Sequence, residues 1–241
     1  MTEPVVLHAM RDLVDRQIVD ADDLLAGKVD DLLLACGGAG PTVTGLLVGA
    51  GALAPRIGGR LGAAFEDVVR RLSAPQWEPQ CLSPDLYRRT QSAIELTVPR
   101  EYARGVAPRA PVHRNLPRGP VEELEDVRLS DLIGAAVFDA SGFPVAPVGD
   151  ARLILSGPAV DAVGVAMAVD GLIIGLGSVG DRLGFRLPHG PKRPFMLHRA
   201  FRSVARHARL VRWSEIDRLE PREVHLRVRR EELHTLPDDG I

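Results

Sequence analysis

Apolar and polar residues alternate with a period of two in several short segments, and this pattern predicts β-strands. In residues 224–228, three apolar residues alternate with His225 and Arg227, which predicts a strand with one buried and one solvated face. A similar alternating segment, 94–98, closes the first half of the chain. Residues 18–30 contain Ile-Val, a polar turn and then Lys-Val-Asp, a pattern typical of a β-hairpin. Short strands joined by Gly-rich turns predict a mainly β fold, a sandwich or a barrel.

The order of these segments repeats in the two halves of the chain. RDLVDRQIVDADDLLAGKVDDLLL begins at Arg11, and SDLIGAAVFDASGFPVAPVGDARLI begins at Ser130. In both, Asp-Leu is followed by an apolar pair, Asp-Ala, a turn, Val-x-Asp and an apolar strand. Next come VTGLLVGAG from Val43 and VGVAMAVDG from Val163, each leading toward Arg-Leu-Gly. We interpret the chain as a duplication of one small β domain; the alternative is a chance similarity between two valine-rich hairpins.

A proline-rich segment, residues 104–126, separates the two halves. Its four prolines fix φ and lack an N–H donor, so neither a helix nor a central strand is expected to continue through it. We therefore predict a first domain over residues 8–103, a semi-extended linker over 104–126 and a second, more divergent domain over 127–237. The spacing of apolar residues also predicts one short helix in each domain, over residues 63–72 and 195–209.

The composition is that of a folded globular protein, with 45% apolar and 26% charged residues among 241. Aromatic residues make up only 4% of the chain, so we expect a core of aliphatic side chains. Charge is unevenly distributed: residues 1–35 carry eight acids and three bases, whereas residues 188–230 carry twelve bases and four acids. This asymmetry indicates either contact between the two ends of the chain or an anionic partner for the second half.

The sequence predicts neither a secretory leader nor a membrane-spanning helix. The first residues lack a basic segment followed by a sustained apolar run. A spanning helix needs ~20 mostly apolar residues, and the best window, 159–179, is interrupted by Asp161 and Asp170. The two cysteines, Cys36 and Cys81, do not have the spacing of a metal site. We expect a soluble, cytoplasmic protein.

Residues 11–34 resemble the opening of a PRC-barrel domain, in which an apolar pair, Asp and a Gly-containing turn lead to Gly-Lys-Val-Asp-Asp. Ile18, Val19 and Asp20 match the first part, and residues 27–31 match the second. The second half departs from this pattern, because Pro-Val-Gly-Asp stands at residues 147–150. Its residues Val211 to Asp217 resemble the closing segment of the family, an aromatic residue and a short acidic stretch before the last strand.

This resemblance implies two small PRC-like β-barrel domains in tandem, each with a short helix. PRC-barrel domains occur in the cytoplasmic part of a photosynthetic reaction-centre subunit, in a ribosome maturation factor and beside bacterial magnesium transporters. Their common property is binding to another macromolecule, and the family has no shared catalytic residues to carry over. The resemblance therefore implies a bacterial interaction protein that needs no cofactor.

Three patterns that could carry chemistry are weak. Residues 175–180 match G-x-G-x-x-G, but the acid expected ~20 residues later is missing, so a glycine turn between strands is the preferred interpretation. Asp20, Asp22 and Asp23 lack the glycine and glutamate of a calcium loop, and we interpret them as solvated turn acids. The seven histidines include no i, i+4 pair and no H-E-x-x-H. We predict no catalytic, metal-binding or cofactor-binding residues and no small-molecule substrate.

A group of basic residues in the second half is the only candidate binding surface in the sequence. Four of its arginines recur at helical spacing and share one face of the helix expected over 195–209. They could contact phosphates of RNA, anionic lipid or an acidic protein, and the alternative is a solvated helix face. No aromatic residues interleave with them, so sequence-specific single-strand binding is not expected. The group consists of Lys192, Arg193, Arg199, Arg202, Arg206 and Arg209.

Together these features predict a non-enzymatic adaptor or regulatory protein that binds a protein partner. One alternative is an RNA- or ribosome-associated processing or assembly factor that uses the basic second domain. Another is a soluble regulator that contacts a membrane magnesium transporter. An enzyme with an unrecognised site would require a pocket that contains titratable groups with perturbed pKa values.

Overall fold

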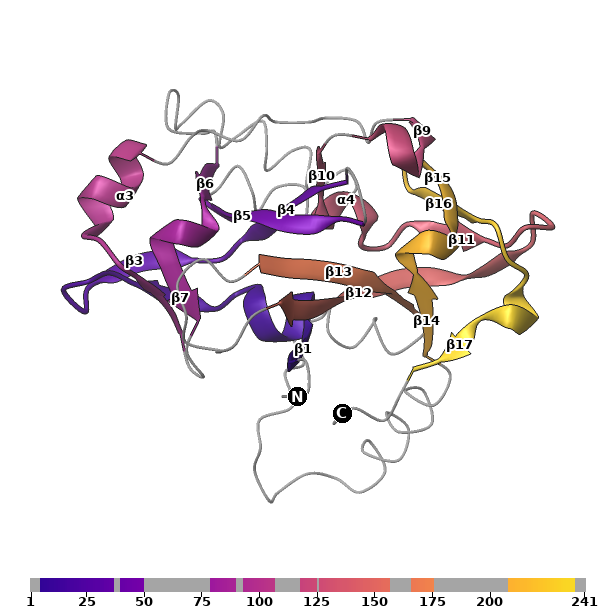
Figure 1. The fold of residues 1–241 in the computed structure, drawn as a ribbon, viewed down its shortest axis with the longest axis horizontal. Coiled ribbons are helices and arrows are strands. Elements are labelled where there is room, and N and C mark those ends of the chain that lie inside the picture. Colours follow the sequence, from indigo (N-terminus) through magenta and orange to yellow (C-terminus); the bar gives the residue numbers. More distant parts are fainter. Residues whose placement is uncertain are drawn as a thin grey trace, which may run out of the picture.

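The structure, a computed structural model, describes residues 5–36, 40–49, 79–89, 93–106, 118–124, 126–156, 166–175 and 208–236. More than half of these residues lie in β-strands, and the helical segments among them are short. The prediction of a mainly β protein is confirmed. Figure 1 shows an elongated molecule whose central strands run along its long axis.

The first half of the chain forms a set of short strands with two helical turns and one helix. The predicted hairpin is present, with strands at Gln17–Val19 and Leu25–Lys28, and so is the predicted closing strand. The elements are β1 (Val5–His8), η1 (Ala9–Leu13), β2 (Gln17–Val19), β3 (Leu25–Lys28), β4 (Asp31–Ala35), β5 (Thr42–Val48), β6 (Gln80–Leu82), η2 (Pro84–Leu86), β7 (Tyr87–Arg89), β8 (Ile94–Leu96) and α3 (Arg100–Val106).

The second half forms a similar succession, with one strand much longer than its neighbours. The alternating segment near residue 224 is a strand, as predicted. The elements are β9 (Gly119–Pro120), η3 (Val121–Glu123), β10 (Asp126–Arg128), α4 (Leu129–Leu132), β11 (Ala136–Phe138), β12 (Pro144–Ser156), β13 (Ala166–Ile174), β14 (Arg209–Arg212), η4 (Trp213–Glu215), β15 (Ile216–Glu220), β16 (Glu223–Leu226), η5 (Arg230–Glu232) and β17 (His234–Thr235).

The same strand pairings recur in the two halves. In the first half, β2 is antiparallel to β3 and parallel to β8, and β7 pairs with β8. In the second half, β11 is antiparallel to β12 and parallel to β16, and β15 pairs with β16. The long strand β12 takes the place that β3 and β4 share in the first half.

Each half contributes one strand to the other half. β1 is antiparallel to β12, with Val5 opposite Leu155, and β10 is antiparallel to β4, with Asp126 opposite Ala35. β5 and β13 also pair with each other. These contacts join thirteen strands into one sheet, and the order β3-β2-β8-β7 forms a second sheet of four. Because the sheets of the two halves are merged, the structure does not confirm two separate barrels in tandem.

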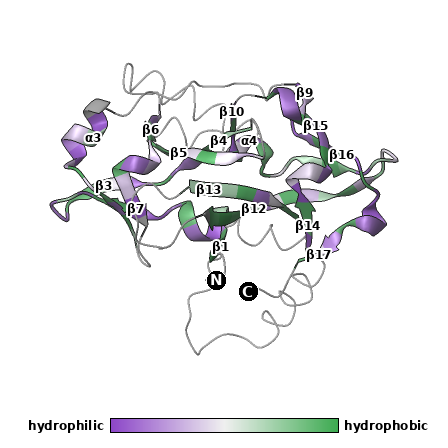
Figure 2. Cartoon of the chain, in the orientation of Figure 1, coloured by the Kyte–Doolittle hydropathy of each residue, from purple (hydrophilic) through white to green (hydrophobic). Residues whose placement is uncertain are grey.

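One aliphatic core spans both halves of the chain. Its cluster of buried side chains includes Leu13 and Ile18 from the first half and Leu132 and Leu172 from the second. Fully burying such a side chain contributes ~1.5–3 kcal/mol. Figure 2 shows hydrophobic residues along the central strands and hydrophilic residues on α3 and η5 at the two ends. An aliphatic core of this kind is what the scarcity of aromatic residues predicts.

The glycine-containing strands correspond in a different register from the one that the sequence comparison suggests. Gly49 follows β5 with φ 114° and Gly175 follows β13 with φ 130°. Four positions earlier, Gly45 and Gly171 each lie very close to a neighbouring strand. A Cβ at Gly45 would overlap Cys81 Sγ, and a Cβ at Gly171 would overlap the carbonyl oxygen of Val211. GLLVG therefore matches GLIIG. The match expected from the sequence rests on two similar valine-rich runs. In the structure, the close approach of a neighbouring strand determines which positions have to be glycine.

Part of the expected linker is packed into the fold. α3 includes residues 104–106, and β9 pairs with β15 at the edge of the large sheet. Pro120 lies in this edge strand, where a missing N–H is tolerated. Val121 and Leu124 are buried in the core, so the apolar residues beside the prolines anchor this end of the segment. Residues 107–117 and the helix expected at 63–72 lie outside the described part of the chain.

Candidate functional site

The turn of the β2–β3 hairpin is held by the side chain of Asp20. Its Oδ1 accepts the N–H groups of Asp22 at 3.0 Å and Leu24 at 2.9 Å, and its Oδ2 accepts the N–H of Arg100 at 3.2 Å. Asp23 adopts φ 59°, a left-handed conformation that aspartate tolerates in turns. The carboxylate therefore ties the hairpin to the first residue of α3.

Asp20 is not the solvated acid that the sequence interpretation assumed, because only 3% of its surface is exposed. Burial raises the pKa of Asp20, but the backbone donors at Leu24, Arg100 and Asp22 outweigh burial, so the pKa lies below its usual value. Asp22 and Asp23 are exposed, as expected. The sequence could not distinguish one structural acid from its two solvated neighbours.

The turn of the β11–β12 hairpin is built in the same way around Asp139. Its Oδ1 accepts the N–H groups of Ser141 at 2.9 Å and Phe143 at 3.0 Å, and its Oδ2 accepts that of Arg230 at 3.4 Å. Gly142, with φ 80°, takes the left-handed position that Asp23 occupies in the first hairpin. The backbone donors from Phe143, Ser141 and Arg230 lower the pKa of Asp139 against a smaller effect of burial.

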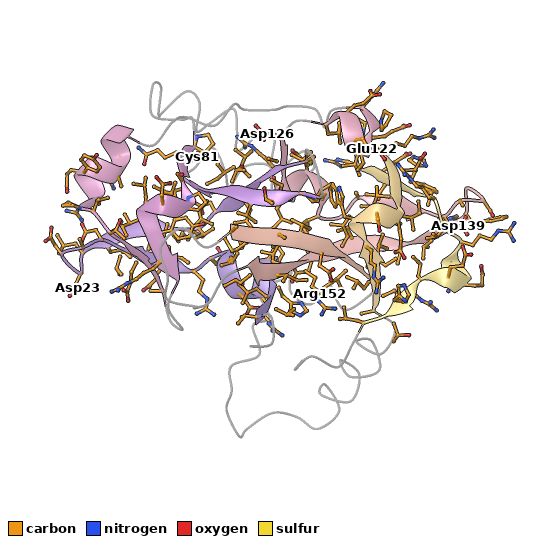
Figure 3. All side chains as sticks on the ribbon, in the orientation of Figure 1. Asp23, Cys81, Glu122, Asp126, Asp139 and Arg152 are labelled. Atoms are coloured by element: carbon orange, nitrogen blue, oxygen red, sulfur yellow. The ribbon has the colours of Figure 1, made fainter. Side chains whose placement is uncertain are left out.

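Both turns present large apolar side chains to solvent. Leu24 is 48% exposed, Leu25 is 59% exposed and Phe143 is 68% exposed. We call these three residues and their turns the hairpin tips. Asp23 and Asp139, which mark the two turns, lie at opposite ends of the molecule in Figure 3. Scattered exposed apolar residues are common. The unusual feature here is that turns with matching hydrogen bonds present them at both ends.

A second pair of aspartates joins the two halves in the interior. Asp31 in β4 accepts the Ser130 Oγ–H at 2.6 Å and the Ser130 N–H at 3.0 Å, at the start of α4. Asp150 in β12 accepts the N–H of Met10 at 2.8 Å, in η1. Each half therefore uses the aspartate of its Val-x-Asp motif to bind the helical turn of the other half. The motif was visible in the sequence, but its partner was not.

Burial sets the protonation of the acids at this junction. Asp31 is 1% exposed, and burial raises its pKa to about 6 against the opposing effect of its hydrogen bonds and of Arg128. Burial also raises the pKa of Asp131 to about 6. Asp31 lies in β4 and Asp131 in α4, and these two elements are in contact. Hydrogen bonds from Ser130 in the other half give Asp31 a structural role. Asp131 instead has a hydrogen bond with the backbone of Arg128 in its own half.

We expect the contribution of Asp31 to the free energy of unfolding to fall as the pH rises through the window from 3.8 to about 6. The unfolded carboxyl loses its proton near pH 3.8, whereas folded Asp31 keeps its proton to about pH 6. The folded state therefore binds more protons in this window, and the stabilisation present below pH 3.8 is lost above pH 6. For Asp31 the difference is at most about 3 kcal/mol.

Urea unfolding at several pH values, with wild type and Asp31→Asn compared at each, measures this effect. The difference between the two proteins isolates Asp31, because the other carboxyl groups titrate in both. Asp22→Asn, at an exposed position, should keep the wild-type slope. A slope that is the same in wild type and Asp31→Asn would show that Asp31 does not carry the pH dependence.

One group of potential metal ligands occurs among the described residues, at the β15–β16 turn. It consists of Glu220, Glu223 and His225, whose ligand atoms all lie within 4.8 Å of one another. No metal ligands are predicted from the sequence, because these three residues match neither the helical spacing of histidine ligands nor a known metal-binding loop. A search for acidic and histidine residues on one face of a predicted hairpin could have found this group.

The basic residues predicted as a binding surface lie mostly outside the described residues. This applies to Lys192, Arg193, Arg199, Arg202 and Arg206, so the basic surface remains a prediction. Arg209 is described and begins β14 rather than ending a helix. Its guanidinium donates to the carbonyl oxygens of Leu233 at 3.0 Å and Arg230 at 3.4 Å. The expected helix therefore cannot include Arg209, whose strand pairing with β13 overrides the helical spacing.

The G-x-G-x-x-G motif is described only at its first residue. Gly175 follows β13, and its N–H donates to the Pro147 carbonyl at 3.2 Å. Gly175 corresponds to Gly49 in the first half, and both glycines follow a strand with a positive φ. The remaining residues of the motif lie outside the described part of the chain.

No protein-family model matches this chain, and no curated protein matches its sequence. The resemblance to PRC-barrel domains therefore stays a prediction. Within the described residues, no helix has both the length and the apolar character needed to cross a membrane.

Proposed function

We propose that this chain is a non-enzymatic adaptor or regulatory protein that binds a protein partner through the hairpin tips. The observation that carries the proposal is the exposure of Leu24, Leu25 and Phe143 on turns held by Asp20 and Asp139. Taking a fully exposed side chain of this kind to full burial contributes ~1.5–3 kcal/mol. Covering one of these partly exposed residues in a complex would contribute the share of that energy that corresponds to its exposed surface. A turn that is already fixed loses little conformational freedom on binding, so more of this energy remains available for affinity.

We also propose that the two halves are divergent copies of a PRC-barrel-like domain that have exchanged the strands β1 and β10. The recurring strand pairings, the matching turns at Asp20 and Asp139, and the matching contacts of Asp31 and Asp150 support this interpretation. In such an arrangement neither copy is complete without the other. The exchange would therefore hold the two tips at a fixed separation, which suits an adaptor with two contact points.

Photo-crosslinking in the native cells tests the hairpin tips directly. A photoreactive phenylalanine analogue replaces Phe143 in one variant, Leu25 in a second and the exposed residue Ser214 in a control. We expect discrete, nuclease-resistant crosslinks to a polypeptide from the two tip positions and none from the control position. Phe143→Ser should abolish recovery of the same polypeptide without changing the unfolding midpoint, because this side chain is mostly in solvent.

The same experiment separates the alternatives. Crosslinks to RNA, or complexes lost on nuclease treatment, would replace the protein-binding proposal by the ribosome- or RNA-associated role. Crosslinks to lipid would favour contact with a membrane surface. Equal crosslinking from Ser214 and Phe143 would show that the tips are ordinary surface.

A further inference from the structure

The turn between β15 and β16 brings three potential metal ligands to one face of a hairpin. Glu220 and Glu223 are direct partners across the strand pair, and His225 lies two residues beyond Glu223. Residues two apart on a strand share a face, and directly opposed residues have Cβ atoms about 5 Å apart. Pro221 and Arg222 form the tight turn, with Arg222 at φ 66°. The pleat of the sheet therefore forces the three side chains together.

The distances among these side chains suit a shared metal ion. Glu223 Oε2 lies 3.2 Å from His225 Nε2, and all three ligand atoms fall within 4.8 Å of one another. Two ligands of a tetrahedral zinc ion are about 3.3 Å apart when each bond is about 2.0 Å long. The pair of Glu223 and His225 already has this spacing. Glu220 has to approach by a change of rotamer at a half-exposed position.

The imidazole is held in a fixed plane. The ring of Phe138 stacks on His225, with ring centroids 5.3 Å apart and 17° between the planes. The two rings face each other because β11 and β16 are parallel neighbours that pair Phe138 with His225. Only 21% of the His225 side chain is exposed. A fixed ring keeps Nε2 directed at Glu223 and lowers the conformational entropy lost when a ligand binds.

The charges at the turn also indicate a cation. Two carboxylates placed directly opposite each other on a strand pair destabilise it. Arg218 offsets part of this repulsion by pairing with Glu220 at 3.2 Å, but half of the Arg218 side chain is exposed, and such pairs contribute little. A divalent ion between the carboxylates would neutralise both.

The first half offers an internal comparison. Arg88 and Glu95 occupy the strand positions that correspond to Arg218 and His225, and they form an ion pair at 2.7 Å. Ala93 stands where the second half has Glu223. The corresponding position in the first half therefore holds an arginine–glutamate ion pair and not a group of metal ligands. The ligand set belongs to the second half alone and does not follow from the shared strand arrangement.

We propose that Glu220, Glu223 and His225 form a binding site for a zinc ion. The set of one nitrogen and two oxygen donors fits zinc and related transition metals, whereas magnesium and calcium prefer oxygen donors only. Three protein ligands leave at least one coordination position open to water or to a group from a binding partner. The site is independent of the hairpin tips and of the proposed adaptor role.

Zinc titration of the metal-free full-length protein tests the site. A chromogenic chelator competes for Zn²⁺ at pH 7, with wild type, His225→Gln, Glu223→Gln and His234→Gln compared. His234 is the matched control because it also pairs with a glutamate, Glu215 at 3.7 Å, but no third ligand is grouped with that pair among the described residues. We expect one zinc ion to bind wild type and His234→Gln alike. Each of the other two variants should bind it at least about tenfold more weakly, because even the loss of a group that only hydrogen-bonds to a metal ligand costs this much.

Two further measurements keep the outcome independent of folding. The unfolding midpoint of each protein is measured without and with zinc, and zinc should raise the midpoint of wild type above its own zinc-free value but leave that of His225→Gln unchanged. In spectra that resolve histidine side-chain nitrogens, the His225 signal should shift on adding zinc, and excess Mg²⁺ should not reverse the shift. Equal zinc affinity in wild type and His225→Gln, or an unshifted His225 signal, would overturn the proposal.

Discussion

Replacing Asp31 by alanine is expected to lower the free energy of unfolding by about 3 kcal/mol at pH 7. The change removes the acceptor of Ser130 Oγ–H, Ser130 N–H and Leu32 N–H, all at a side chain that is 1% exposed. Buried donors without a partner each cost ~1–3 kcal/mol, and the relief of burying a carboxylate offsets part of the sum. Urea unfolding of the variant and of wild type measures the difference.

Two controls define the interpretation of this result. Asp22→Ala removes an exposed acid near the start of the chain and should change the free energy of unfolding by less than about 0.5 kcal/mol. Asp31→Asn keeps the volume and one acceptor oxygen, so it should destabilise the protein less than alanine does. If Asp31→Ala costs no more than Asp22→Ala, the hydrogen bonds from β4 to α4 do not hold the two halves together.

Replacing Gly171 by alanine is expected to lower the free energy of unfolding by more than about 3 kcal/mol. The new Cβ would overlap the carbonyl oxygen of Val211 and crowd the Cα of Arg212, both in the backbone of β14. Crowding against side chains typically costs ~1–3 kcal/mol. Here no rotamer change relieves the overlap, so β14 has to move away from β13 and lose ladder hydrogen bonds. Circular dichroism and urea unfolding measure the loss.

The corresponding change in the first half separates side-chain from backbone crowding. In Gly45→Ala the new Cβ meets the Sγ of Cys81, a side-chain atom that can be removed by mutation. We expect Cys81→Ala to recover stability in the Gly45→Ala background, with a coupling energy of at least about 1 kcal/mol. Val211→Ala should not rescue Gly171→Ala. A Gly171→Ala protein as stable as wild type would contradict the close approach of β13 and β14.

The local features of this fold follow from the sequence. The β2–β3 hairpin and the strands at Ile94–Leu96 and Glu223–Leu226 have period-two patterning and turn residues whose preferences are set by their own backbone. The mainly β class and the aliphatic core follow from the same patterns and from the scarcity of aromatic residues. These properties depend on neighbours within a few positions, which is why the sequence alone determines them.

Other features required the tertiary structure. The exchange of β1 and β10 between the halves depends on pairing between residues far apart in sequence, and periodicity carries no information about the partner of a strand. Asp20 and Asp22 look alike in sequence, but only Asp20 accepts the N–H of Arg100, eighty positions away. The spacing of the arginines predicts a helix that includes Arg209, but Arg209 lies in β14, which pairs with β13. Glu220, Glu223 and His225 match no spacing rule, and they meet because the turn at Arg222 and the pleat of two strands place them on one face.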